Sequence, residues 1–331
     1  MKEESIRPIS IVKKMHKSTM HDVRYLLKKK KFFVKVNCPA CNNKNYNQFL
    51  KKRKFNYNIC TKCKTFFLNP RPSLKILDNF YKQSKVYEYF NNFIFPQTEK
   101  IRSQKIFLPR INKIIDLCKK NSIKNPKIMD IGAGFGTFLK LAKKKDYFKS
   151  ILAVEPSKDG IKSCKKKKIN VIEDLLENLN PKKIGTFDVI TNFEVIEHLY
   201  SPIKFLKKIK KFLTKNGILV ITCPNGQGYD IQILKEKSNS IDHEHLNYFN
   251  PTSIQVLFKR SGYKIIEVFT PGQLDVDIII NKIKNENFKM KNDFIYNYIL
   301  NSNNEKIKMN FQNFLSENNL SSNMWIVSRP I

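Results

Sequence analysis

The stretch that most limits how this chain can fold is KIMDIGAGFGTFLK, residues 127–140. A short apolar run ends at Asp130, three alternating glycines follow at Gly132, Gly134 and Gly136, and an apolar-periodic segment begins directly after them. Glycines lack Cβ atoms, so the backbone can turn tightly there and lie against a flat ligand. The pattern therefore predicts a strand, a tight turn and a helix, with a ligand at the turn.

The spacing of the glycines distinguishes this loop from two phosphate-binding loops. A dinucleotide fingerprint needs a glycine five positions after Gly132, where this chain has Thr137. A P-loop needs Gly-Lys followed by Ser or Thr, and no such triplet closes this loop. An acid does follow, because Glu155 ends the apolar run ILAVE, 19 residues after Gly136. A carboxylate at that place can accept both hydroxyls of a ribose, so the loop is expected to hold a nucleoside.

Short apolar runs alternate with helical patterns through the rest of the chain. The further strand candidates are SILAVE, INVIE, FDVITNF, GILVITCP, YKIIEVF and MWIVSR. Helices are expected near 98–120, 135–145, 157–167, 202–213 and 251–261, and across much of 274–318. This alternation predicts an α/β fold with a doubly wound, mostly parallel seven-stranded sheet and a ligand site at the carboxyl ends of its strands.

Four of the seven cysteines form two C-x2-C pairs, Cys38 with Cys41 and Cys60 with Cys63, separated by 18 residues. Two such pairs can close a tetrahedron of thiolates around Zn²⁺. In a cytoplasmic chain, metal ligation is favoured over disulfides. Cysteine at all four positions leaves no open coordination site, so a small N-terminal zinc ribbon with a structural zinc is expected. The other three cysteines are interpreted as small core residues: Cys118, Cys164 and Cys223.

Breakers and shifts in composition divide the chain into four expected segments. They are a basic N-terminal extension at 1–36, the zinc ribbon at 37–72, a helical linker or lid at 73–125, and an α/β domain at 126–331 with a helical insertion near 274–318.

The formal net charge of +34 is the most extreme feature of the composition. Arginine, which reads bases and phosphates better than lysine, is rare, and the lysines are scattered. Compositional drift therefore explains the charge better than a nucleic-acid partner, with attraction to an anionic substrate as a by-product. No run approaches the ~18 apolar residues of a membrane span, and the N-terminus has no apolar signal-peptide core. A soluble, cytoplasmic chain of open oligomeric state is expected.

Taken together, these motifs resemble the class I S-adenosylmethionine-dependent methyltransferases. The glycine loop corresponds to their first motif, Glu155 to their ribose-binding acid, and FDVITNFEVIEHL to their fourth-strand motif. Asp174, in VIEDLLENL, matches the residue that meets the adenine edge. The resemblance implies S-adenosylmethionine as cofactor, held by Asp130, Gly132, Gly134, Gly136, Glu155, Asp174 and Glu194.

A narrower resemblance rests on the cysteine ribbon, the linker NFYKQS and the loop DHEHLNYFNPTSIQVLFKRSGY. These are similar to methyltransferases of sugar and surface-polysaccharide biosynthesis, including C-methyltransferases of nucleotide-linked keto-sugars. The similarity covers most of 38–280 and the tail LSSNMWIVSRP. It implies a small-molecule acceptor, a nucleotide-linked sugar or glycan precursor, with His245 as proton acceptor and Glu244 assisting. Asp242 replaces a tyrosine of those enzymes, whose C-terminal region is longer, so their exact substrate is not carried over.

Several alternatives stay open at this point. The runner-up is a zinc-ribbon RNA base methyltransferase, although the chain lacks the Asn/Asp-Pro-Pro-aromatic motif with which amino-methylating enzymes stack a flipped base. A non-enzymatic ribbon adaptor would not need the glycine loop. A metal at DHEH (242–245) lacks further spaced ligands in the sequence. His198 either lines the pocket or caps backbone, and three tyrosines either close over the sulfonium or pack under the ribbon: Tyr81, Tyr87 and Tyr89.

Overall fold

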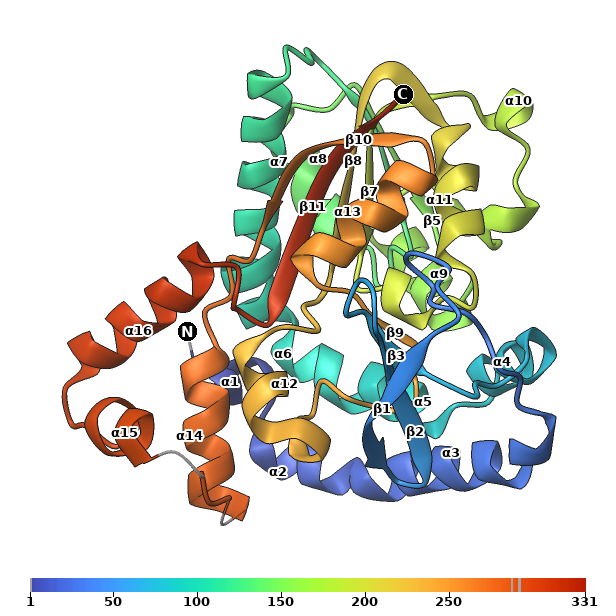
Figure 1. Ribbon diagram of the computed structural model, residues 1–331. Helices are drawn as coiled ribbons and strands as arrows, with labels where there is room; N and C mark the ends of the chain where they lie inside the picture. Colours follow the sequence, from blue (N-terminus) through green and yellow to red (C-terminus); the bar gives the residue numbers. More distant parts are fainter. Residues whose placement is uncertain (1, 287, 291–292) are drawn as a thin grey trace.

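The computed structural model describes residues 2–286, 288–290 and 293–331. Its centre is a seven-stranded sheet with the strand order β10-β11-β8-β7-β4-β5-β6 (Figure 1). The strands are β4 (Lys127–Ile131), β5 (Ser150–Val154), β6 (Val171–Ile172), β7 (Phe187–Phe193), β8 (Leu213–Pro224), β10 (Tyr263–Phe269) and β11 (Asn323–Pro330). Neighbours from β6 to β8 pair in parallel, and β11 runs antiparallel to both β8 and β10. The predicted doubly wound, mostly parallel sheet is confirmed.

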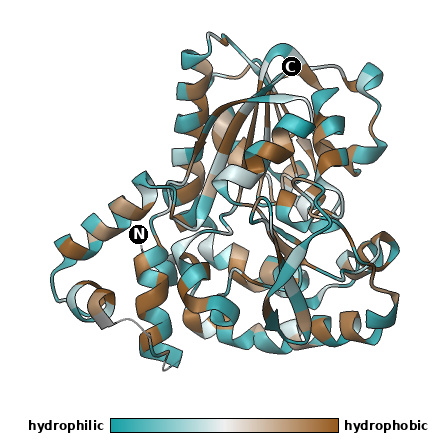
Figure 2. Cartoon of the chain, viewed as in Figure 1, coloured by the Kyte–Doolittle hydropathy of each residue, from teal (hydrophilic) through white to brown (hydrophobic). Residues whose placement is uncertain are grey.

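Helices cover both faces of this sheet, and alternate residues of each strand pack toward opposite faces. Ile128 of β4 packs in one core cluster, whereas the adjacent Met129 packs in the other. The first cluster takes its helical residues from α7 (Leu108–Lys120), α8 (Thr137–Lys143) and α9 (Lys158–Lys166). The second takes them from α10 (Pro181–Ile184), α11 (Pro202–Lys210) and α13 (Pro251–Arg260). Figure 2 shows hydrophobic residues along the central strands and hydrophilic ones on the outer sides of the helices.

Some predicted boundaries differ from the observed ones. The helix expected over 202–213 ends at Lys210, because Leu213 already begins β8 and pairs with Phe187. The strand expected from INVIE is reduced to Val171–Ile172, at the edge of the sheet. The helix expected from 135 begins at Thr137, because Gly136 has a left-handed backbone with φ of +67°.

A second, antiparallel sheet contains the cysteine segment. Its strands β1 (Tyr46–Lys52), β2 (Phe55–Cys60) and β3 (Phe66–Leu68) are joined by β9 (Asn247–Tyr248), which comes from the loop after β8. Buried Arg71 strengthens this junction, since its guanidinium donates to the carbonyls of Leu68, Tyr200 and Leu246. The ribbon therefore packs directly on the segment that carries DHEH. The expected segment boundaries themselves stay predictions.

Helices from both ends of the chain lie beneath the large sheet (Figure 1). The N-terminal ones are α1 (Glu3–Ile6), α2 (Ile9–Lys14), α3 (His16–Lys28) and η1 (Lys30–Phe32). Between the ribbon and β4 lie α4 (Leu74–Tyr81), α5 (Lys85–Tyr89), η2 (Phe90–Ile94), α6 (Phe95–Arg102) and η3 (Ser103–Phe107).

The remaining helices belong to the α/β part and to the insertion before β11. Short helices within the α/β part are η4 (Leu176–Asn178), η5 (Ile196–His198), α12 (Tyr229–Leu234) and η6 (Lys235–Lys237). The insertion before β11 contains α14 (Asp275–Glu286), α15 (Asp293–Ile295), η7 (Tyr296–Leu300) and α16 (Glu305–Glu317).

Among the described residues, no helix combines the length and apolar character needed to cross a bilayer.

Candidate active site

The glycine loop connects β4 to α8 in a backbone conformation that side chains oppose. Gly132, Gly134 and Gly136 all have positive φ, at +75°, +53° and +67°. A Cβ atom at Gly132 would lie 2.7 Å from Cγ2 of Val195, and one at Gly136 would lie 2.7 Å from Sγ of Cys164. A Cβ at Gly134 would meet nothing within 4 Å. The loop is thus packed on both sides and open at its middle, where a ligand can approach the backbone.

Glu155 links this loop to the neighbouring strand. It follows β5, is 6% exposed, and accepts the N–H of Gly134 at 2.7 Å and the N–H of Ser157 at 2.8 Å. Charge-assisted bonds to two backbone donors fix the carboxylate beside the loop. The structure therefore brings together the glycines and the acid that the sequence pairs for a nucleoside.

Two further expected cofactor residues lie at the same edge of the sheet. Asp130 is buried under the loop and accepts the Thr191 hydroxyl at 2.7 Å, and burial raises the pKa of Asp130 to about 7. Asp174 lies beyond β6, where one carboxylate oxygen accepts from Leu175 N–H and the Asn178 amide, both at 2.7 Å. Asp130 thus lies buried near the end of β4, whereas Asp174 lies in the turn after β6, and both line the same cleft.

Glu194, the last expected cofactor residue, directly follows β7 with a φ of +55°. Its Oε1 accepts from Arg110 at 3.0 Å, from the Thr222 hydroxyl at 2.6 Å and from the Asn323 amide at 3.1 Å. The Arg110 guanidinium also lies 4.6 Å from the ring centre of Phe193. Sequence reasoning missed Arg110, which no local motif marks.

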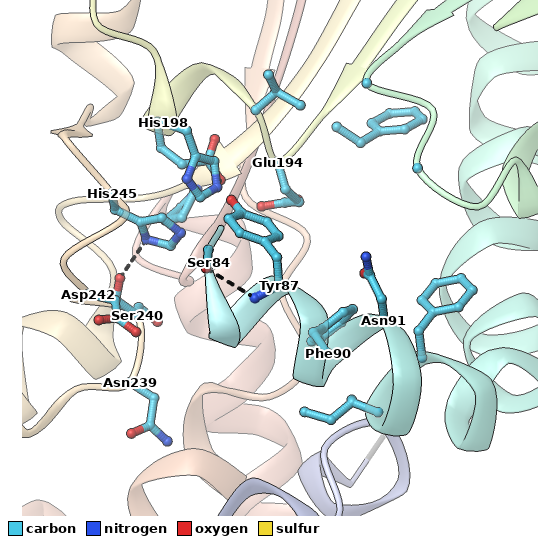
Figure 3. Close-up of a pocket in the computed structure, with 18 of the residues that line it drawn as sticks. Ser84, Tyr87, Phe90, Asn91, Glu194, His198, Asn239, Ser240, Asp242 and His245 are labelled. Carbon is cyan, nitrogen blue, oxygen red and sulfur yellow. Dashed lines mark hydrogen bonds and ion pairs between the residues drawn. The ribbon is translucent and has the colours of Figure 1, made fainter. Parts of the chain in front are cut away.

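All of the expected cofactor residues except Gly136 line one open cleft of about 3470 Å³. Histidines from two segments lie on its opposite wall (Figure 3). His198 ends η5, and His245 belongs to the DHEH loop that precedes β9. Their rings are perpendicular, with centres 4.6 Å apart. Nδ1 of His198 lies 3.2 Å from the Glu244 carbonyl, and Nδ1 of His245 lies 2.9 Å from the Ser240 carbonyl.

The structure does not place all of DHEH in the cleft. Glu244 is buried and does not line the cleft, and burial raises the pKa of Glu244 to about 7. His243 is also buried, with Nδ1 against the carboxylate of Asp242. His245 therefore lines the cleft, whereas Glu244, which was expected to assist it, does not.

Two of the three candidate tyrosines reach this wall. Tyr81 donates to the His198 carbonyl at 3.2 Å, and its ring centre lies 5.9 Å from that of Tyr87, which also lines the cleft. Tyr89 instead donates to the carbonyl of Ile11 in α2. The aromatic wall is therefore formed by α4 and α5, with Tyr89 facing the N-terminal helices.

The four ribbon cysteines gather at one point. One sulfur from each of Cys38, Cys41, Cys60 and Cys63 lies within 4.8 Å of the others, with the closest pairs at 3.4 and 3.5 Å. Zn–S bonds of about 2.3 Å in a tetrahedron place sulfurs about 3.8 Å apart, so the donor set fits Zn²⁺. The site lies among core residues away from the cleft, as a structural ion would.

We expect removal of the ribbon zinc to destabilise the whole α/β domain, because β9 and Arg71 connect the two sheets. Cys60→Ser should lose the metal and lower the melting temperature by about 10 °C. Elemental analysis and thermal denaturation measure the two effects. Cys118→Ala, at a cysteine outside the cluster, should keep its zinc. A variant that loses zinc and melts unchanged would contradict the structural role.

Comparison with known proteins agrees with this geometry. The model of a family described as methyltransferase domain matches residues 102–268, half of the chain. Ubiquinone biosynthesis O-methyltransferase of Rickettsia typhi is 24% identical over 208 residues, 58% of this chain and 79% of that protein. The protein of the same name from Pelagibacter ubique is 35% identical over 109 residues, 31% of this chain and 44% of that protein.

The chain also has matches among solved structures. A SAM-dependent methyltransferase from Archaeoglobus fulgidus is 20% identical with a TM-score of 0.47, covering 72% of this chain and 100% of that chain. A second SAM-dependent methyltransferase, from Clostridium acetobutylicum, is 14% identical with a TM-score of 0.47. The match covers 73% of this chain and 98% of that chain. The family match, together with the observed strand order and glycine loop, identifies the chain as a member of the methyltransferase-domain family, a class I S-adenosylmethionine-dependent methyltransferase.

Proposed function

We propose that this enzyme methylates a small-molecule acceptor, a nucleotide-linked sugar or glycan precursor used for surface polysaccharide. The combination of ribbon, linker and DHEH loop supports this acceptor class. Cations beside the loop support it too. Lys52 donates to the carbonyls of Ser238 and Ile241, and Arg53 pairs with Asp242 at 3.0 Å. These charges line the cleft near His245 and suit an anionic acceptor.

The cofactor half of the proposal rests on one observation, the contact between Glu155 and Gly134 N–H. Gly132, Gly134 and Glu155 would hold the adenosyl part, with Asp174 at the adenine edge and Glu194 on the methionine side. Asp130 and Gly136 would shape the loop. Bound S-adenosylmethionine supplies an activated methyl group on a positively charged sulfur. The protein then has to position the acceptor and remove its proton.

His245 is the proton acceptor in this proposal. A backbone carbonyl can only accept, so Nδ1 of His245 donates its hydrogen to Ser240 and Nε2 keeps a free lone pair. Burial lowers the pKa of His245, which keeps the ring neutral at neutral pH. Glu244 does not line the cleft and would act by orienting His198, whose Nδ1 lies 3.2 Å from the Glu244 carbonyl. Glu244 is thus a positioning residue.

We expect His245→Gln to lower turnover by about 10²–10⁴-fold, because general base catalysis contributes that much. The affinity for S-adenosylmethionine should stay unchanged. Turnover is measured with radiolabelled cofactor and a nucleotide-sugar extract, and affinity by calorimetry. His16→Gln, an exposed cleft histidine, is the matched control. Lost cofactor affinity in His245→Gln would mean that the residue has another role.

The acceptor class is tested by mass spectrometry of nucleotide-sugar pools from cells with and without the protein. A methylated nucleotide-sugar that depends on the protein is the expected result. Two other outcomes would replace the proposal. Label transferred to an oxygen atom of a ubiquinone precursor would favour the chemistry in the names of the Rickettsia and Pelagibacter relatives. Label transferred to RNA, with a steep salt dependence of binding, would favour a base methyltransferase.

A further inference from the structure

Three side chains that bind metals gather on the histidine wall of the cleft. Glu197 and His198 are adjacent in η5, and His245 comes from a loop 47 residues later. One donor atom from each residue lies within 4.8 Å of the other two. This cluster is separate from the four cysteines of the ribbon, and its donors are nitrogen and oxygen instead of sulfur.

Both imidazoles are held in the tautomer that a metal ligand needs. Nδ1 of His198 donates to the Glu244 carbonyl, and Nδ1 of His245 donates to the Ser240 carbonyl. The free lone pair of each ring is therefore on Nε2. Histidines that bind metals almost always donate their other ring hydrogen in this way, to a backbone carbonyl or a carboxylate.

Glu197 supplies a carboxylate oxygen that has no partner. It is 1% exposed, and its Oε2 is buried without a hydrogen-bond partner. Its Oε1 lies 4.0 Å from Nε2 of His198. A buried carboxylate oxygen without a partner is costly. Glu194, three residues earlier, differs because its Oε1 already accepts three hydrogen bonds.

The cluster is also open on one side. Glu197, His198 and His245 all line the cleft, so an ion held by them would keep coordination positions free toward the cleft. Two histidines and one carboxylate with open positions form a donor set typical of divalent transition metals.

We propose that Glu197, His198 and His245 form a binding site for one divalent transition-metal ion of the Zn²⁺ or Co²⁺ class. The site goes beyond the proposed function, although it shares His245 with it. Nε2 of His245 has a single lone pair, which can bind either a metal ion or a proton. The ion therefore competes with the proton that His245 would remove from the acceptor. The metal-bound enzyme is therefore the form whose proton acceptor is blocked.

Cobalt provides the test, because its spectrum reports its ligands. The full chain is first loaded with zinc in the ribbon and then titrated with Co²⁺. We expect one added equivalent with visible d–d bands and without the near-ultraviolet band of thiolate-bound cobalt. Glu197→Gln, His198→Gln and His245→Gln should each weaken cobalt binding by at least about 100-fold, since losing only a ligand's partner costs 10–100-fold. His16→Gln should bind cobalt as the wild type does.

Binding of S-adenosylhomocysteine, measured by calorimetry on the same proteins, separates this inference from the proposed function. It also shows that each variant is folded. Wild-type protein that binds S-adenosylhomocysteine but takes up no second metal would overturn the site and leave methyl transfer standing. Cobalt binding that survives all three substitutions would also overturn it. Cobalt binding without S-adenosylhomocysteine binding would support the metal site and contradict the proposed cofactor geometry.

Discussion

Glu155→Ala is expected to weaken S-adenosylmethionine binding by about 100-fold or more. Two hydrogen bonds from the ribose to a charged acceptor are worth about 1.5–3 kcal/mol each, and 1.4 kcal/mol is a factor of ten. The substitution also leaves the N–H groups of Gly134 and Ser157 without their acceptor, so the glycine loop loses its attachment to β5. Isothermal titration calorimetry measures the affinity.

Glu173→Ala is the matched control for this substitution. Glu173 precedes Asp174 in the chain, is exposed, and pairs on the surface with Lys165, so its loss removes the same charge without touching the loop. We expect its cofactor affinity to equal that of the wild type. Unchanged affinity in a folded Glu155→Ala protein would show that the adenosyl group does not lie across the glycine loop.

Asp22→Ala is expected to destabilise the protein by about 3 kcal/mol, although Asp22 lies in the N-terminal extension. Its carboxylate is 1% exposed and accepts the Ser84 hydroxyl at 2.6 Å and the N–H groups of Lys85 and Val86, both at 3.0 Å. It therefore caps the first turn of α5, where an acid is most favourable. Each donor left buried without a partner costs about 1–3 kcal/mol.

The same substitution should also reduce methyl transfer, because α5 carries Tyr87 to the histidine wall. Denaturant unfolding measures stability, and turnover is followed below the unfolding transition. Asp116→Ala, at an exposed position on α7, removes the same charge and should change stability by less than about 0.5 kcal/mol. Equal stabilities of the Asp22 and Asp116 variants would contradict the capping role.

The ribbon and the candidate active site are joined through the segment that carries DHEH and β9. β9 pairs with β3 of the ribbon and directly follows the DHEH loop, while Arg71 donates to the carbonyl of Leu246, next to His245. The ribbon and the N-terminal helices thus position the histidine wall of the cleft. The seven-stranded sheet positions the glycine loop and Glu155.

The glycine-loop side of the cleft could be predicted from the sequence because its signals are local. The glycine loop, Glu155 at a strand end and the two C-x2-C pairs depend on spacing within short segments, and backbone geometry translates that spacing directly into turns, strand ends and knuckles. Alternating apolar runs likewise predicted the sheet, since each strand buries residues on both faces.

The histidine wall was decided by tertiary structure. Arg110 donates a hydrogen bond to Glu194, which lies 84 residues later in the chain. Asp22 caps α5, a helix that begins about sixty residues later, and β9 pairs with β3 of the ribbon. The sequence showed no ligands that could complete a metal site at DHEH, yet the fold brings Glu197 and His198 beside His245. Such contacts depend on how separate elements pack, and no local period or spacing encodes them.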